Sequence, residues 1–140
     1  MGVNRILKWA FVASVAVYAG VAVAVAGPPR WDSPWLPPDP THRVLLFVLA
    51  FIGAGTWAAG WVVGHMKEPP VQSAHELVVR RPPIFGRQRF ILAAALIEAG
   101  AIYGLVLSLV TKDSRYAIAF AVPALVLLLL TPTGGEGQGA

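Results

Sequence analysis

The chain has 140 residues, of which 56% are hydrophobic and 13% are charged, against roughly 25% charged in an ordinary soluble domain. This scarcity of charge argues against a soluble fold and predicts an all-α membrane protein. The net charge of +4 would suggest nucleic acid as a partner, but the basic residues gather between apolar runs, where they favour a role in membrane orientation. There is no cysteine and there are three scattered histidines, so we expect no disulfide, no thiolate nucleophile, no metal site and no cofactor.

Four apolar runs organise the chain, and a bilayer core of about 30 Å needs roughly 20 helical residues to cross it. The fourth run is near the lower limit for a span and contains Pro123, which is expected to bend the helix. We expect residues 1–131 to form one four-helix transmembrane domain arranged as two hairpins, and residues 132–140 to form a flexible tail. The runs cover residues 6–26, 44–65, 90–110 and 116–130.

The first run has a second interpretation, as a signal peptide. Arg5 and Lys8 form a basic start, and Ala24-Val25-Ala26 resembles a signal-peptidase site. The apolar stretch of about 20 residues is long for a signal peptide, so we expect a retained helix. Cleavage of residues 1–26 stays open at this point.

Basic residues in the loops indicate an orientation. Seven of the eleven lie before the first run or between the second and third, and four lie in the other two loops. The positive-inside rule therefore predicts cytoplasmic termini and a cytoplasmic middle loop, in what we expect to be a prokaryotic plasma (inner) membrane. The first group is Arg5, Lys8, Lys67, Arg80, Arg81, Arg87 and Arg89, and the second is Arg30, Arg43, Lys112 and Arg115.

The loop between the first two runs is of a different kind. Its stretch from Gly27 to Thr41 holds six prolines together with Trp31 and Trp35. Proline at this density favours stiff, extended backbone, and indole rings suit the boundary between membrane and water. We expect Trp31 and Trp35 to be interface anchors on the outer surface.

Glu98 is the only ionisable acid or base well inside any of the four runs. A central charge costs about 3 kcal/mol on insertion scales, and each neighbouring Leu, Ile, Val or Phe returns about 0.3–0.6 kcal/mol, so the helix still inserts. An acid at this depth is a functional hypothesis, because a carboxyl that exchanges its proton in an apolar setting can carry a proton or a sodium ion. The alternative is a neutral Glu98 that makes one structural hydrogen bond between helices.

Glycines at helical spacing indicate faces where helices pack closely. In the third run they lie on a different face from Glu98, and in the second run they form a stripe that is interrupted by Trp57. Small residues four apart let a neighbouring helix approach. The predicted packing positions are Gly53, Gly60, Gly64, Gly100 and Gly104.

The stretch from Ala95 to Val106 reads A-L-I-E-A-G-A-I-Y-G-L-V. It resembles the carboxylate helix of the proteolipid (c) subunit of rotary ATP synthases, in which an L-x-E-A-x-A-I-Y-G-L-V pattern carries the ion-binding glutamate. The resemblance implies that Glu98 binds a proton or a sodium ion, that Tyr103 supports it from about one turn away, and that the second and third runs form the proteolipid hairpin. With two further runs flanking the hairpin, the chain is similar to a divergent, four-helix relative.

Three functions remain open at this point. The first is a proteolipid-like membrane subunit with Glu98 as an exchanging carboxyl in a larger complex, and the second is a non-catalytic accessory subunit. The third is a small multidrug-type exporter, a class that carries its membrane glutamate in the first helix, where Ala13 stands here. No nucleotide loop or nucleophile–base pair is present, so we do not expect an enzyme. The expected partners are the lipid bilayer and other membrane subunits or further copies of the chain, without nucleic acid.

Overall fold

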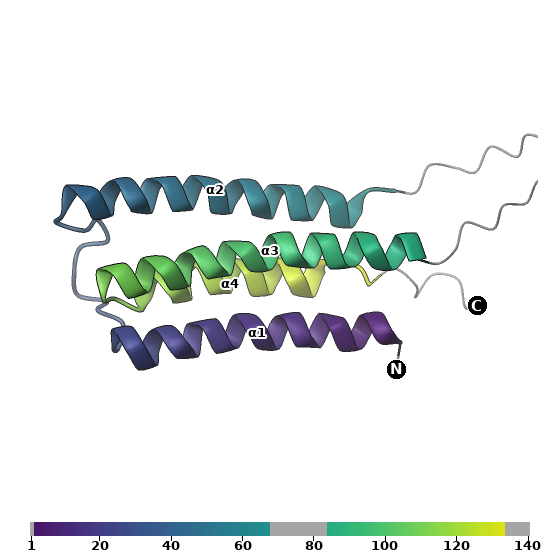
Figure 1. Cartoon of the computed structure of the whole chain (residues 1–140), viewed down its shortest axis with the longest axis horizontal. Helices are drawn as coiled ribbons and strands as arrows, with labels where there is room; N and C mark the ends of the chain where they lie inside the picture. Colours follow the sequence, from purple (N-terminus) through teal and green to yellow (C-terminus); the bar gives the residue numbers. More distant parts are fainter. Residues whose placement is uncertain (1, 68–83, 134–140) are drawn as a thin grey trace, which may run out of the picture.

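The computed structural model describes residues 2–67 and 84–133 (Figure 1). These residues form four helices and no strand: α1 (Val3–Ala26), α2 (Pro40–His65), α3 (Ile84–Thr111) and α4 (Arg115–Leu130). The predicted all-α fold is confirmed, and each predicted run lies inside one helix. Residues 134–140 of the predicted tail, and Arg80 and Arg81 of the middle loop, lie outside the described residues.

Three of the helices, α1, α2 and α3, are long and apolar enough to cross a membrane. The fourth is shorter. With 16 residues, α4 rises about 24 Å at 1.5 Å per residue, which is less than the bilayer core of about 30 Å.

Helix α3 lies at the centre of the bundle and packs against each of the other three helices (Figure 1). The chain passes back and forth, so α1 and α3 run in the same direction. The expected pair of hairpins is only half present, because α1 and α2 share no packing contact within the described residues. The loop 27–39 instead carries the chain across the end of the bundle, with α3 between α1 and α2.

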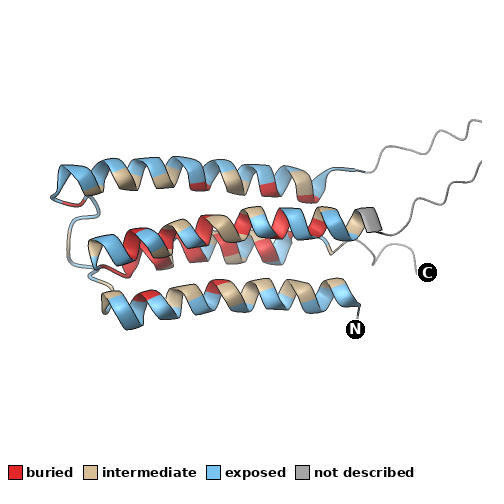
Figure 2. Ribbon diagram, in the orientation of Figure 1, coloured by how far each residue is buried: buried red, intermediate tan, exposed pale blue. Residues whose placement is uncertain are grey.

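Buried side chains concentrate on α3 and α4, whereas α1 and α2 bury few (Figure 2). The outward face of α2 exposes large apolar side chains such as Phe47 and Phe51, which suits a surface in contact with lipid. The main core consists of Val15, Phe90, Ala94, Ile97, Ala101, Ala121, Ala124 and Leu128.

Local sequence explains where the helices begin and end. Asp39 caps α2, because its carboxylate accepts a hydrogen bond from the Thr41 N–H at 2.8 Å, and Pro40 occupies the first helical position. Helix α3 ends in a Schellman motif, in which Lys112 has a φ of 54° and the Asp113 N–H donates to the Ser108 carbonyl at 3.1 Å. This tight reversal brings α4 back along α3.

Candidate functional site

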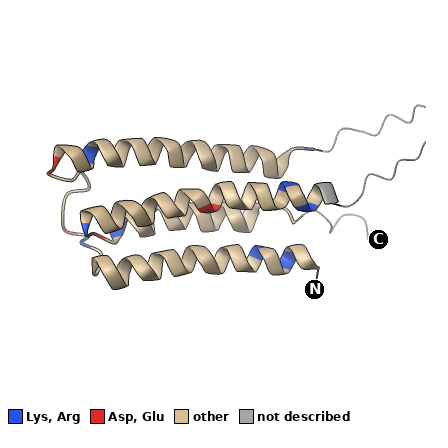
Figure 3. Cartoon of the chain, viewed as in Figure 1, with Lys and Arg blue, Asp and Glu red and all other residues tan. Residues whose placement is uncertain are grey.

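Glu98 lies near the middle of α3, and the other charged residues of the described helices lie near helix ends (Figure 3). Its half-buried side chain faces α1. The Tyr18 hydroxyl donates to Glu98 Oε1 at 2.8 Å, and the Ser14 hydroxyl makes a second hydrogen bond to the same oxygen. Ser14 and Tyr18 are four residues apart, so they share one face of α1. The site is therefore a carboxyl with two hydroxyls on one of its oxygens.

The hydrogen of the Ser14 hydroxyl has two acceptors within reach. Ser14 Oγ lies 2.9 Å from the Phe11 carbonyl oxygen and also contacts Glu98 Oε1. When Glu98 is ionised, both hydroxyls can donate to it. When Glu98 is protonated, it can donate to Ser14 Oγ while Ser14 donates to Phe11. The same arrangement of heavy atoms thus satisfies both states of the carboxyl.

Trp57 of α2 contacts the opposite side of the same turn of α3. Its indole N–H donates to the Ile97 carbonyl at 3.2 Å, and its ring lies against the backbone of Gly100. A Cβ atom at Gly100 would lie 2.5 Å from Trp57 Cε2, so no side chain fits there without displacing the ring. The tryptophan that interrupts the glycine stripe of α2 is thus accommodated by a glycine of α3.

The other predicted packing glycines also lie at close contacts. A Cβ at Gly104 would lie 2.5 Å from Phe120 Cβ, and one at Gly60 would lie 2.9 Å from the Ala93 carbonyl oxygen. Gly53 and Gly64 face Phe120 and Thr131 at 3.0 and 3.1 Å from the position of an added Cβ. Aromatic rings, as well as helix backbones, occupy the space that these glycines leave.

The structure does not bring Tyr103 to Glu98. Tyr103 packs with the cluster of Leu107, Tyr116 and Phe120 and lies 3.7 Å from the position of an added Cβ at Gly53, on the side of α3 that faces α2 and α4. Five residues of helix separate it from Glu98 and turn it about 140° away. The tyrosine that hydrogen-bonds to the carboxyl is Tyr18.

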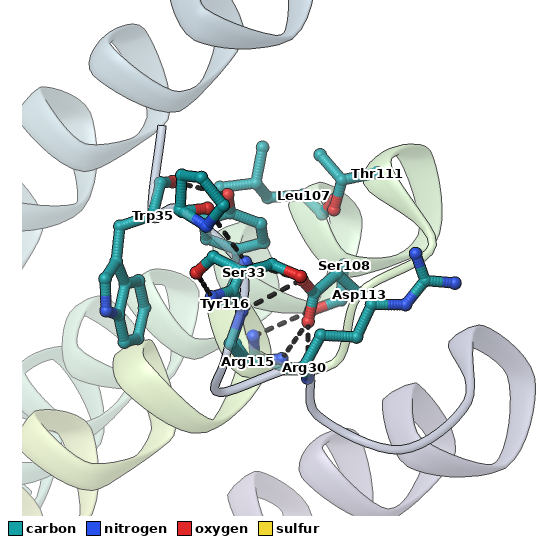
Figure 4. A network of polar contacts seen from close by, with 11 residues as sticks. Arg30, Ser33, Trp35, Leu107, Ser108, Thr111, Asp113, Arg115 and Tyr116 are labelled. Carbon is teal, nitrogen blue, oxygen red and sulfur yellow. Dashed lines mark hydrogen bonds and ion pairs between the residues drawn. The ribbon is translucent and has the colours of Figure 1, made fainter. Parts of the chain in front are cut away.

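A second polar cluster joins the loop 27–39 to the turn between α3 and α4 (Figure 4). Arg115, which is 2% exposed, forms an ion pair with Asp113 at 2.8 Å. Its guanidinium also donates to the Ser33 carbonyl at 2.5 Å and to the Pro34 carbonyl at 3.1 Å. Prolines lack an N–H, so this loop has few donors of its own. Arg115 therefore supplies hydrogen bonds that fix the loop to the bundle.

The two loop tryptophans have different surroundings. Trp31 is 56% exposed, and Trp35 is 49% exposed because one side of its ring covers the polar cluster. The Arg115 guanidinium lies 5.0 Å from the centre of the Trp35 ring, and the Tyr116 hydroxyl donates to the Trp35 carbonyl at 2.6 Å. The prediction counted Arg115 among the solvated charges of a loop, and this was wrong, because the guanidinium is buried and paired.

Opposing influences act on the pKa of Asp113. Burial would raise the pKa of this carboxyl, but the hydrogen bond from the Arg115 side chain and those from the Arg115 and Arg30 backbone N–H groups lower it further. The pKa of Asp113 therefore lies below its usual value of 3.8, and the ion pair is charged at neutral pH.

The other end of the bundle holds α1 to α4. Lys8 Nζ donates to the Leu129 carbonyl at 2.7 Å and to the Thr131 carbonyl at 3.0 Å, where the last carbonyls of α4 have no partner within the helix. The Asn4 side chain donates to the Thr133 carbonyl at 2.6 Å. Polar contacts thus fix α1 on one side at its start and, through the loop, at its end.

Ser14 and Tyr18 were not recognised as site residues from the sequence. The signal available was that they are the only polar side chains within the apolar run after Trp9, one helical turn apart. Within the described residues no group of three or more His, Cys, Asp or Glu side chains lies close enough to hold a metal ion.

The fold and the site define a small helical membrane protein with one carboxyl at mid-span. Residues 45–111, a little under half of the chain, match the family model of the ATP synthase c-type proteolipid. The match covers almost all of α2 and all of α3, so the resemblance to the proteolipid is confirmed and extends across both helices. No curated protein and no solved structure matches the chain.

Proposed function

We propose that this chain is a proteolipid-like membrane subunit in which Glu98 takes up and releases a proton or a sodium ion within a larger complex. The observation that carries the proposal is the half-buried carboxyl of Glu98, placed in the family-matching helix and hydrogen-bonded by Ser14 and Tyr18. An ion carrier must be stable with and without its ion, and one rotating hydroxyl supplies that here. The chain would act as a non-catalytic subunit, with other membrane subunits or further copies of itself as partners.

Replacing Glu98 with glutamine is the direct test. Glutamine keeps the size of the side chain and can still bond to the two hydroxyls, but it cannot take up or release a proton. We expect the Glu98→Gln variant to assemble and to lose coupled ion flux in membrane vesicles that contain the native complex. A carboxyl-reactive carbodiimide should modify Glu98 in the wild type in a pH-dependent way and leave the variant unmodified at this position. Normal flux in the variant would rule out the proposal.

We further propose that both termini and the middle loop face the cytoplasm of a prokaryotic plasma membrane, and that Trp31 and Trp35 lie at the outer interface. Because the chain has no cysteine, single cysteines report orientation cleanly. A membrane-impermeant maleimide added to intact cells should label Asp32→Cys, an exposed loop position, and spare Lys67→Cys, which is exposed at the other end of the bundle. Inverted vesicles should give the opposite pattern. Labelling of Lys67→Cys in intact cells would reverse the orientation.

A non-catalytic accessory subunit is the second candidate, and one observation favours it. The hydrogen bonds of Glu98 tie α1 to α3, so the carboxyl could serve only to hold the bundle together. In that case Glu98→Gln would leave flux unchanged, and Glu98→Ala would lower the thermal stability of the chain or its recovery with the complex.

A further inference from the structure

The two hydroxyls that bond to Glu98 come from outside the region that matches the family. That region begins at residue 45, whereas Ser14 and Tyr18 belong to α1. Helix α1 is fixed at its start by Lys8 on the end of α4, and at its end by a loop that Arg115 holds. The hydroxyl pair is therefore held against the carboxyl by contacts within the same chain.

We propose that α1 completes the ion site within a single chain, and that Ser14 and Tyr18 make it a site for a proton and exclude sodium. This inference rests on the proposed function of Glu98 as an exchanging carboxyl, and it assigns positioning roles to two residues that the family match does not reach. Tyr18 is a fixed donor to Oε1, and Ser14 is a donor or an acceptor according to the state of Glu98.

The oxygens of the site are too few and too close together for a sodium ion. Hard cations in proteins gather about six oxygen ligands, and within the described residues only the side chains of Ser14 and Tyr18 bond to Glu98. A cation of the size of Ca²⁺ or Na⁺ binds oxygens at about 2.3–2.6 Å, which holds neighbouring ligand oxygens roughly 3.3 Å or more apart. The Tyr18 oxygen lies 2.8 Å from Oε1, a separation that fits a shared hydrogen.

A proton, in contrast, requires no rearrangement of heavy atoms. On protonation of Glu98, the Ser14 hydroxyl turns to the Phe11 carbonyl oxygen at 2.9 Å and accepts the hydrogen of the carboxyl. On deprotonation it turns back, so the carboxylate keeps two donors. Hydrogen bonds to a charged group are worth about 1.5–3 kcal/mol against about 1 kcal/mol for neutral pairs, so both hydroxyls favour release of the proton.

The electrostatic surroundings of Glu98 are simple. Tyr18 is the titratable side chain that faces it from α1. The charged or titratable side chains of α2, namely His42, Arg43 and His65, lie near the ends of that helix, and Arg115 begins α4. No described cation therefore pairs with Glu98, which leaves the two hydroxyls as its polar partners.

The test is carbodiimide labelling of Glu98 in the full chain, reconstituted in lipid vesicles and read by mass spectrometry of the peptide that contains Glu98. In the wild type, replacing potassium chloride with sodium chloride at constant ionic strength should leave the labelling rate unchanged at every pH. Ser14→Ala and Tyr18→Phe should each move the midpoint of the labelling curve to higher pH by about one unit, because each removes a hydrogen bond to the charged form.

Matched variants separate positioning from a general effect on the fold. Ser14→Thr keeps the hydroxyl and should restore the wild-type curve. The double variant Ala13→Ser/Ser14→Ala moves the hydroxyl by about 100° around α1, to an exposed position, and should label like Ser14→Ala. Circular dichroism confirms equal helix content, and a variant that does not fold is replaced in the comparison by the double variant.

Two results would overturn the inference. Slower labelling of the wild type in sodium would show that the site holds sodium, and wild-type curves for both Ser14→Ala and Tyr18→Phe would show that α1 does not position the carboxyl. Failure of the proposed function is distinguishable from either, since it appears as normal flux in Glu98→Gln whatever the labelling curves show.

Discussion

Replacing Arg115 with alanine is expected to lower the free energy of unfolding by about 3–5 kcal/mol, the range found when one partner of a buried ion pair is removed. Asp113 is 6% exposed and would lose both side-chain hydrogen bonds from Arg115. The carbonyls of Ser33 and Pro34 would lose their donor as well. The measurement is a titration with a denaturing detergent in mixed micelles, followed by far-ultraviolet circular dichroism.

The double variant Asp113→Asn/Arg115→Ala is the control, because it removes the charge that Arg115→Ala leaves unpaired. It should recover part of the lost stability. If Arg115→Ala unfolds within about 1 kcal/mol of the wild type, the buried pair does not fix the loop to the bundle.

Acid should act on the same cluster. Because the pKa of Asp113 in the folded chain lies below 3.8, its contribution to stability is present above about pH 4 and is lost as the pH falls through the folded value. The loss should be smaller in Arg115→Ala, which lacks the side-chain hydrogen bond that lowers this pKa most, and absent in Asp113→Asn.

Adding one methyl group at Gly100 is the second change with a large expected effect. In the Gly100→Ala variant the new Cβ would overlap the Trp57 ring, and overpacking of this kind costs about 1–3 kcal/mol. Displacing the ring would also break its hydrogen bond to Ile97. We expect a loss at the upper end of that range, in the same detergent titration, and a weaker contact between α2 and α3 at the level of Glu98.

Gly55 supplies the matched control on α2. An added Cβ there has no neighbour within 4 Å, so Gly55→Ala should be neutral or should stabilise the helix by about 0.5–1 kcal/mol. A smaller side chain at position 57, as in Trp57→Leu/Gly100→Ala, should relieve the overlap and recover stability relative to Gly100→Ala. Equal stability of Gly100→Ala and Gly55→Ala would contradict the packing described.

The sequence by itself determined the helices and the residue on which the proposed function depends. Apolar runs are recognisable without a structure, because a bilayer requires length and composition that soluble helices rarely combine. One charge in the middle of such a run is equally visible, which is why Glu98 and the proteolipid resemblance could be predicted. Asp39 and Pro40 likewise indicate the start of α2, since helix caps depend on neighbouring residues alone.

Only the tertiary structure decided which side chains meet. Ser14 and Tyr18 lie 84 and 80 residues from Glu98 in the chain, and their contact depends on α1 packing beside α3. The resemblance implied Tyr103 as the support, but the rotation of α3 directs that ring towards α2 and α4. Arg115 is read from the sequence as a solvated loop charge, and its burial follows from the folding of a proline-rich loop over the end of α4. Local rules set each helix, whereas side-chain partners depend on how whole helices pack, because the apolar surfaces of these helices do not by themselves specify a neighbour.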